Sequence, residues 1–281
     1  MEATKLQKLS AVATRIRMAV VEGVYCAKSG HPGGSLSIAD MLAYLYTEEL
    51  RVDPKNPTWA DRDRFVMSKG HCAPALYGAL AVSGFFPEEE IRSLRHTGAM
   101  LQGHPCMTTT PGVDMSTGSL GQGVSAAAGM ALGAKLDGKD YRTYAILGDG
   151  EIQEGQVWEA AMFAAHKKLS NLCVIVDNNG LQIDGAVDEV NSPYPIPEKF
   201  AAFGFNVVEI DGHNFDEIEA ALAAARACTD KPTAIVMKTV KGKGVSFMEN
   251  QVGWHGKGPN AEEYEQAMQE LRAALAAIEE G

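Results

Sequence analysis

Apolar residues along the chain recur in two kinds of pattern, and the two kinds alternate. Segments in which they recur every three or four positions predict helices over 3–27, 37–50, 119–135, 156–168, 216–227 and 261–278. Short apolar runs without polar alternation lie between them and predict strands over 64–68, 144–147, 172–176, 205–210 and 233–239. Strands of this kind are buried on both faces of a parallel sheet. The pattern therefore predicts an α/β fold with a doubly wound, mainly parallel sheet and helices on both faces.

Local signals refine this outline. Ser37 begins the second predicted helix and Asp40 follows three residues later, which is the spacing of a capping box, so we expect Ser37 to be the N-cap. The strands at 144–147 and 172–176, with the helix between them, should form one right-handed β-α-β unit. No Pro/Ser-rich linker or block of charge divides the chain, so we expect residues 1–281 to form a single domain.

Composition and charge narrow the class of protein. Hydrophobic residues make up 46% of the 281 residues and charged residues 22%, which excludes a disordered chain. A net charge of −11 without a basic run argues against nucleic-acid and anionic-membrane partners. No apolar run reaches membrane-spanning length, and the charged N-terminus lacks the apolar core of a signal peptide. Five scattered cysteines without a C-x-x-C pair predict reduced thiols in a cytoplasmic protein, with Cys173 buried in its strand.

Two loops rich in Gly, Asp and Asn directly follow consecutive predicted strands. GDG (148–150) ends the first strand, and DNNG (177–180) ends the second. The β-α-β geometry brings both loops to one edge of the sheet, where Asp149 offers a carboxylate and Asn179 an amide carbonyl. Such hard oxygen ligands suit Mg²⁺ or Ca²⁺, and Mg²⁺ completes its shell with phosphate and water. Either loop alone is ordinary turn chemistry, but the pair at this spacing favours a metal and phosphate site.

Other phosphate motifs are weaker. No GxxxxGK[ST] is present, because none of the three Gly-Lys pairs is followed by Ser or Thr. The segment 121–126 matches G-x-G-x-x-A, but no predicted strand precedes it, so the context for a dinucleotide site is missing.

Four of the seven histidines lie in glycine-flanked turns: His31, His71, His104 and His255. A lone histidine in a loop is usually a solvated or capping side chain. Four in rigid turns instead suggest imidazoles held around one pocket for hydrogen bonding and proton transfer. A zinc site is the rival interpretation, but no pair has the tight H-x₃₋₅-H spacing. His96 and His166 fall in helical patterns and should lie on the surface.

Several of these segments together resemble transketolases. GDG followed by Asn179 resembles the thiamine diphosphate motif, and the segments that resemble transketolase in particular are SGHPGG (29–34), SKGH (68–71), GHP (103–105), STGSLGQG (116–123) and LGDGEIQEGQVWEA (147–160). The resemblance runs from the first helix to His255. It covers only the N-terminal, diphosphate-binding module, roughly half of the family's usual subunit.

The resemblance implies a role for each matching residue. The metal, Mg²⁺ with Ca²⁺ or Mn²⁺ as alternatives, would be held by Asp149, Asn179 and the backbone carbonyl of Leu181. The N–H of Gly150 and the side chain of His71 would contact the diphosphate of thiamine diphosphate. The implied cofactor-binding set is His71, Gly118, Leu120, Gly150, Asn179 and His255, in which Gly118 and Leu120 line the thiazolium side.

The implied catalytic set is His31, His104, His255, Glu154 and Glu159. By resemblance, His31 and His255 face the reactive carbon and the sugar oxygens, and His104 binds a substrate hydroxyl. Glu154 and Glu159 match the carboxylates that link the two active sites of the family's dimer. The reaction implied is transfer of a two-carbon ketol unit from a ketose phosphate to an aldose phosphate.

The family's activating glutamate and its sugar-phosphate clamp belong to a pyrimidine-binding module that these residues do not contain. Without that module the cofactor is poorly activated. We therefore expect either a truncated fragment or, favoured by the initial Met and the amphipathic last helix, a small subunit. It would work with a C-terminal partner chain, as a dimer of heterodimers.

Two alternatives stay open at this stage. One is another split thiamine diphosphate enzyme, either a specialised ketol transferase, for example on a sulfosugar, or a 2-oxoacid dehydrogenase α subunit. The latter family shares GDG and Asn179 but not the three histidine segments as a set. The other is a cofactor-binding module without catalysis, which would not need the histidines.

Overall fold

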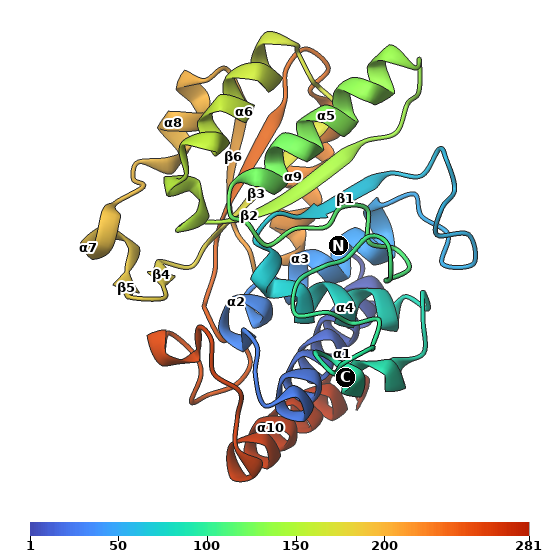
Figure 1. Ribbon diagram of the computed structural model, residues 1–281, viewed down its shortest axis with the longest axis vertical. Helices are drawn as coiled ribbons and strands as arrows, with labels where there is room; N and C mark the ends of the chain where they lie inside the picture. Colours follow the sequence, from blue (N-terminus) through green and yellow to red (C-terminus); the bar gives the residue numbers. More distant parts are fainter. Residues whose placement is uncertain (281) are drawn as a thin grey trace.

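Five parallel strands form a sheet at the centre of the molecule, in the order β1-β2-β3-β7-β6 (Figure 1). The structure is a computed structural model that describes residues 1–280. The strands are β1 (Arg64–Met67), β2 (Thr143–Gly148), β3 (Leu172–Asn178), β6 (Asn206–Asp211) and β7 (Thr233–Lys238), and a separate antiparallel pair is made by β4 (Leu181–Gln182) and β5 (Gly185–Ala186). All five predicted strands are confirmed.

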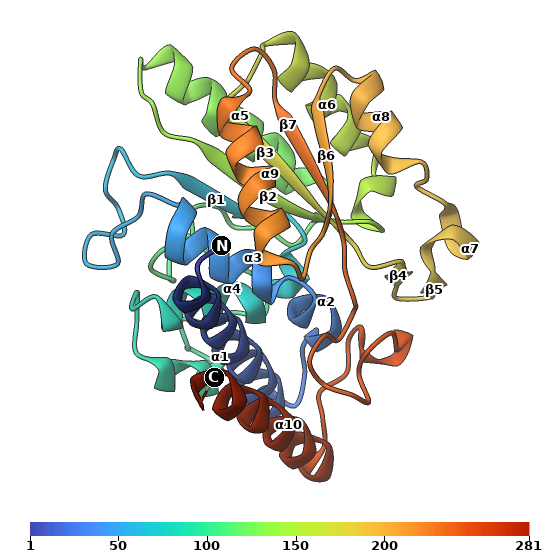
Figure 2. The same ribbon diagram turned by 180° about the vertical axis from the view of Figure 1, so that it is seen from behind.

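Helices cover both faces of the sheet, as Figures 1 and 2 show from opposite sides. One side carries α1 (Ala3–Ala27), α3 (Ala39–Tyr44), α4 (Ala73–Val82) and α9 (Phe215–Ala227), with α10 (Ala261–Glu280) packed on α1. The other side carries α5 (Gln122–Leu136), α6 (Gly155–His166) and α8 (Ile196–Ala202). Two short helices, α2 (Pro32–Leu36) and α7 (Val187–Asn191), lie toward the carboxyl ends of the strands. The predicted doubly wound α/β architecture is confirmed.

Successive residues of the central strands enter different cores, which explains why these strands show no polar alternation. In β2, Tyr144 and Ile146 pack with α1, α3 and α4, whereas Ala145 and Leu147 pack with α5 and α6. The side chains of β2 and β3 are therefore covered by helices on both faces, whereas the edge strand β6 is only partly covered. Cys173 in β3 is fully buried as predicted, and no cysteine in residues 1–280 forms a disulfide.

A helical segment over 39–49 confirms most of the helix predicted over 37–50, but the prediction of Ser37 as its N-cap is wrong. The chain forms α2, then α3 with Ile38 at its N-cap, and continues as a π-helical turn over Leu45–Glu49. The Ser37 hydroxyl contacts the Gly34 carbonyl and donates to Asp177, and Asp40 is buried. These tertiary partners satisfy the two side chains in place of the capping box.

Two other differences have simple causes. Helix α5 begins at Gln122 rather than 119, because Gly121 adopts a left-handed conformation with φ 80° and breaks the helical run. Helix α4 was not predicted, because its buried residues surround it and leave no amphipathic period.

His96 and His166 are exposed, as expected. Within residues 1–280, no helix is both long and apolar enough to cross a bilayer.

Candidate active site

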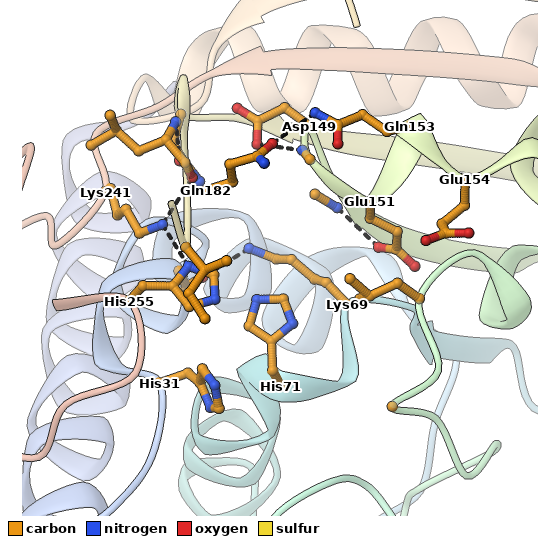
Figure 3. Close-up of a pocket in the computed structure, with 18 residues that line it drawn as sticks. His31, Lys69, His71, Asp149, Glu151, Gln153, Glu154, Gln182, Lys241 and His255 are labelled. Carbon is orange, nitrogen blue, oxygen red and sulfur yellow. Dashed lines mark hydrogen bonds between the residues drawn. The ribbon is translucent and has the colours of Figure 1, made fainter. Parts of the chain in front are cut away.

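The two glycine-rich loops meet at the carboxyl edge of the sheet, as the β-α-β reasoning predicts. Gly148 at the end of β2 pairs with Asp177 near the end of β3. Beside them lies a cavity of about 360 Å³ (Figure 3). Ten of the predicted site residues line it: His31, His71, Gly118, Leu120, Asp149, Gly150, Glu154, Asn179, Leu181 and His255. Residues from six separate segments of the chain therefore share one cavity.

Asp149 is a buried carboxylate that forms no ion pair with any residue in 1–280. It is 2% exposed, and its oxygens accept the N–H of Gly150 at 2.8 Å and of Gly180 at 2.6 Å. Burial and the neighbouring Asp177 carboxylate raise the pKa of Asp149 to about 6. Lys69 is the nearby cation, but it pairs with Asp177. A bound divalent cation would supply the missing counter-charge, so Asp149 fits the metal role.

The other two predicted metal ligands lie in the loop after β3. The Asn179 amide donates to Asp177 at 2.8 Å, and its carbonyl oxygen accepts the N–H of Leu181 at 3.1 Å. The carbonyl of Leu181 accepts a hydrogen bond from Lys241 at 2.8 Å, which leaves it a second lone pair. No cluster of three or more His, Cys, Asp or Glu suited to a metal occurs in the described part of the chain. A cation here would therefore depend on one carboxylate, neutral oxygens and the ligand itself.

Three imidazoles gather at the opposite side of the cavity. The ring centroids of His31, His71 and His255 lie 5.1 to 5.5 Å apart. Burial lowers the pKa of all three: to about 4 in His31, to about 4 in His71 with help from Lys69, and to about 3 in His255 with help from Lys241. All three rings are neutral at pH 7. Among residues 1–280 the buried Nδ1 of His31 has no hydrogen-bond partner, so it is available to a ligand.

His104 stands just behind the cavity wall. A Cβ built on Gly118 would lie 2.9 Å from Cδ2 of His104, and Gly118 has φ 146°, so only glycine fits between this ring and the cavity. Burial and Arg95 lower the pKa of His104. The two glutamates separate: Glu154 lines the cavity at its rim, whereas Glu159 lies on the exposed surface of α6 away from it.

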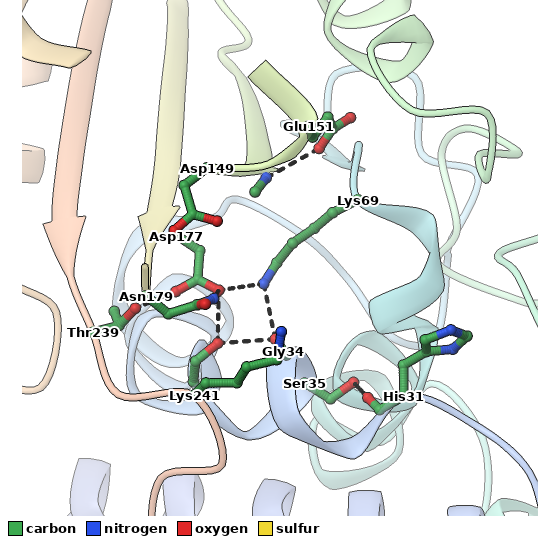
Figure 4. A network of polar contacts seen from close by, with 12 residues as sticks. His31, Gly34, Ser35, Lys69, Asp149, Glu151, Asp177, Asn179, Thr239 and Lys241 are labelled. Carbon is green, nitrogen blue, oxygen red and sulfur yellow. Dashed lines mark hydrogen bonds and ion pairs between the residues drawn. The ribbon is translucent and has the colours of Figure 1, made fainter. Parts of the chain in front are cut away.

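A buried ion pair that the sequence reasoning missed lies beneath the cavity (Figure 4). The Nζ of Lys69, which is 1% exposed, donates to Asp177 at 2.6 Å and to the Gly34 carbonyl at 2.8 Å. Asp177 also accepts from Asn179 and from Thr239. Burial opposes the charge of Asp177, but Lys69 holds its pKa below the usual range. The sequence feature that could have indicated Lys69 is the SKGH segment (68–71), because Lys69 lies two residues before His71.

Two further lining residues were missed. Lys241 is 2% exposed, its Nζ lies 2.9 Å from Nδ1 of His255, and burial lowers its pKa. Its segment lacks the pattern of a phosphate-binding loop, which is why the sequence did not indicate it. Glu151 accepts the Ser68 hydroxyl at 2.6 Å and the N–H of Gly121 and Gly148 at 2.9 and 3.0 Å, which joins the ends of β1 and β2 to the start of α5. Burial raises its pKa.

The arrangement suits an anionic, phosphate-bearing ligand. Two buried lysines and the carboxylate of Asp149 line the cavity, so an anion and a divalent cation would be neutralised there together. Each neutral imidazole beside the lysines can donate one hydrogen bond and accept another. A pocket that only binds a cofactor would not need the imidazoles.

Comparisons with known proteins agree with this geometry. A family model described as "Transketolase, thiamine diphosphate binding domain" matches residues 8–275. The chain is similar to the 6-deoxy-6-sulfo-D-fructose transketolase subunit of Clostridium sp., with 48% identity over 91% of this chain and 93% of that protein. It is also similar to one of the subunits of the apulose-4-phosphate transketolase of Phocaeicola vulgatus, with 42% identity over 98% of both chains.

A solved structure adds a comparison with a longer chain. The structure of transketolase from Campylobacter jejuni aligns with a TM-score of 0.88 and 34% identity, over 99% of this chain and 46% of that one. The similarity therefore spans nearly all of a transketolase subunit of comparable length but less than half of a single-chain transketolase.

Proposed function

Because this chain belongs to the transketolase family, we propose that it is the N-terminal, thiamine diphosphate-binding subunit of a two-chain ketol transferase. The observation that carries the proposal is a cavity that holds three neutral imidazoles and a buried carboxylate, Asp149, which has no ion-pair partner among residues 1–280. The near-complete coverage of relatives named as transketolase subunits supports the two-chain arrangement. Five unpaired cysteines support a cytoplasmic setting.

The residues present fit the cofactor and its metal. Asp149, Asn179 and the Leu181 carbonyl would hold Mg²⁺, and Gly150, His71, Lys69 and Lys241 would surround the diphosphate. When bound, thiamine diphosphate supplies the electron sink for cleaving and forming the bond next to a carbonyl. The orphaned Nδ1 of His31 and the unbalanced charge of Asp149 are the features that such a ligand would satisfy.

The protein's own contribution would be positioning and proton transfer. His31 and His255 are neutral at pH 7, so each can take a proton from a substrate hydroxyl and return it to an oxygen. His104, which packs against Gly118 behind the wall, would orient a substrate hydroxyl at the entrance. Glu154 at the rim would face the partner chain, and we assign Glu159 only an indirect role because it lies outside the cavity.

The partner would be a C-terminal subunit that carries the pyrimidine-binding module and most of the sugar-phosphate contacts. Helix α6 begins beside Glu154 at the cavity rim, and it exposes the apolar side chains of Met162 and Phe163, which are 62% and 39% exposed. We place the partner on this surface, where it would close the cavity. The assembly would be a dimer of heterodimers.

The substrates would be sugar phosphates or their close anionic analogues. The two subunit relatives are named for 6-deoxy-6-sulfo-D-fructose and for apulose 4-phosphate, which favours a specialised ketol transferase as the second candidate. Both candidates use the same cavity, and the partner would decide between them.

Reconstitution tests the proposal. The chain would be purified with the subunit that co-purifies from its source cell and assayed with thiamine diphosphate, Mg²⁺ and a panel of ketose phosphates and 6-sulfo sugars. We expect ketol transfer by the pair and none by the chain alone. Transfer by the isolated chain, free of host transketolase, would refute the half-site assignment. Absence of transfer by the pair with every donor would refute the enzymatic assignment.

A further inference from the structure

The loop that carries Lys241 is anchored on the side away from the cavity. This loop follows β7, and the N–H of Val240 donates to Nε2 of His213 at 2.9 Å. His213 lies two residues beyond the end of β6, the strand next to β7. Because the backbone N–H can only donate, Nε2 of His213 must be unprotonated. The hydrogen bond is therefore compatible only with the neutral ring that carries its proton on Nδ1.

The other ring nitrogen of His213 has a matching acceptor. Nδ1 lies 2.7 Å from Oδ2 of Asp40 on α3, and Arg17 on α1 donates to the same oxygen. Arg17 and Asp40 are both nearly buried, so their charges compensate each other in the interior. The resulting chain of contacts runs from Arg17 through Asp40 and His213 to the backbone of Val240, next to Lys241.

Arg17 touches the same loop at a second point. A Cβ built on Gly244 would lie 3.0 Å from Cδ of Arg17, and Gly244 has φ 92°, so the loop backbone lies directly on the arginine stem. Lys241 is thus flanked by an anchor at position 240 and another at 244. A lysine has four rotatable side-chain bonds, and its buried ammonium group stays in place only if its backbone is held.

We propose that Arg17, Asp40 and His213 are positioning residues that hold the loop after β7, so that the ammonium group of Lys241 faces the diphosphate of the cofactor. The proposal rests on the proposed function for the identity of the ligand. The placement of the loop does not depend on the ligand: it rests on the contacts above together with backbone hydrogen bonds from Gly242 N–H to the Gly33 carbonyl at 2.9 Å and from Asn250 N–H to the Lys241 carbonyl at 2.8 Å. The alternative is that the three residues form a buried polar network that contributes to folding alone.

Two substitutions of His213 separate its two contacts. His213→Asn keeps a donor near the position of Nδ1, toward Asp40, but has no acceptor for Val240. His213→Gln reaches the position of Nε2 and can accept from Val240. Hydrogen exchange over residues 239–242 should speed up in the Asn variant and much less in the Gln variant, with no cofactor present. Equal exchange in the wild-type protein and the Asn variant would overturn the proposal.

Cofactor affinity supplies the second measurement. Calorimetry of the full chain with its partner, using thiamine diphosphate and Mg²⁺, should show about tenfold weaker binding for His213→Asn, as for other residues that orient a ligand-binding side chain. In a Lys241→Met background the same substitution should have almost no further effect on affinity, because the ammonium group that His213 would position is absent. Lys243→Met, in the same loop but paired with Glu249 outside the cavity, should leave the tenfold effect intact.

The outcomes separate the proposal from its alternatives. An equal loss of affinity from His213→Asn with and without Lys241 would show that His213 acts through folding or another route. If the His213→Asn variant does not fold, the same double-mutant cycle is made with His213→Gln. That variant should bind thiamine diphosphate within about threefold of wild type, and a tenfold loss of affinity would overturn the proposal. If the wild-type assembly binds no thiamine diphosphate, the proposed function fails, while the exchange result still decides whether His213 holds the loop.

Discussion

Replacing Asp149 by Asn should stabilise the protein in the absence of metal while abolishing its metal-dependent cofactor binding. The ionised carboxylate is buried near Asp177 without a cation of its own, and its pKa is raised from 3.8 to about 6. The sign follows from linkage: a carboxyl whose pKa is raised on folding favours the folded state when protonated. Its destabilising effect grows as the pH rises from about 4 to about 6 and is complete above that range.

The magnitude combines two opposing effects. A pKa difference of about two units corresponds to about 3 kcal/mol of unfavourable free energy for the charged form. The Asn amide can accept only one of the two backbone hydrogen bonds, from Gly150 and Gly180, and losing the other costs about 1 to 2 kcal/mol. The net stabilisation at pH 8 is therefore about 1 to 2 kcal/mol, or about 2 to 8 °C in Tm for a domain of this size.

Thermal unfolding after EDTA treatment measures this effect. The Tm of Asp149→Asn should exceed that of wild type at pH 8, and the difference should vanish or reverse near pH 4, where the wild-type carboxyl is also neutral. Mg²⁺ with thiamine diphosphate should then raise only the wild-type Tm. Asp184→Asn, which removes an exposed carboxylate in the adjoining hairpin, is the control and should change nothing. A metal-free Asp149→Asn protein that is less stable at every pH would refute the reasoning.

Three further outcomes are expected. The three cavity imidazoles stay neutral in the folded chain down to a pH of about 4, whereas unfolded histidines bind protons below about 6.5. The free energy of unfolding, measured with urea, should therefore be lower at pH 5 than at pH 7 by about 2 kcal/mol for each histidine. An unchanged unfolding midpoint would contradict the assigned burial. Lys69→Met leaves Asp177 as an uncompensated buried charge and should lower the free energy of unfolding by about 3 to 5 kcal/mol, measured with denaturant. The double variant with Asp177→Asn should regain part of that loss, whereas additive effects would show that the pair is not coupled. Glu154→Gln should leave the Tm unchanged but alter cofactor-binding cooperativity or activation in the assembled enzyme. Glu159→Gln, which lies outside the cavity, should alter neither cooperativity nor activation. Identical behaviour of the two variants would leave Glu154 without a role at the rim.

Patterns close together in the sequence were sufficient to predict the strands of the sheet and to select most of the residues that line the cavity. Apolar runs identified all five parallel strands, because strands that pack against helices on both faces are mostly apolar. The loops that end β2 and β3 could be placed at one edge, because parallel strands joined by a helix must end there. Asp149 and Asn179 were therefore found without coordinates, and the histidines of glycine-flanked turns were found by their local context.

Only the tertiary structure decided which charged groups meet in the interior. Lys69 and Asp177 are 108 residues apart, and Asp40 and His213 are 173 apart, so no local spacing indicates either pair. The same contacts explain why the capping box at Ser37 failed: Asp40 is held by Arg17 and His213, and Ser37 donates to Asp177. A buried charge must find its partner wherever the packing of helices on the sheet brings one, and that packing is set by the whole chain. Sequence patterns thus determined the strands of the sheet, the amphipathic helices and the chemistry at the strand ends, whereas the packing determined how that chemistry is held in place.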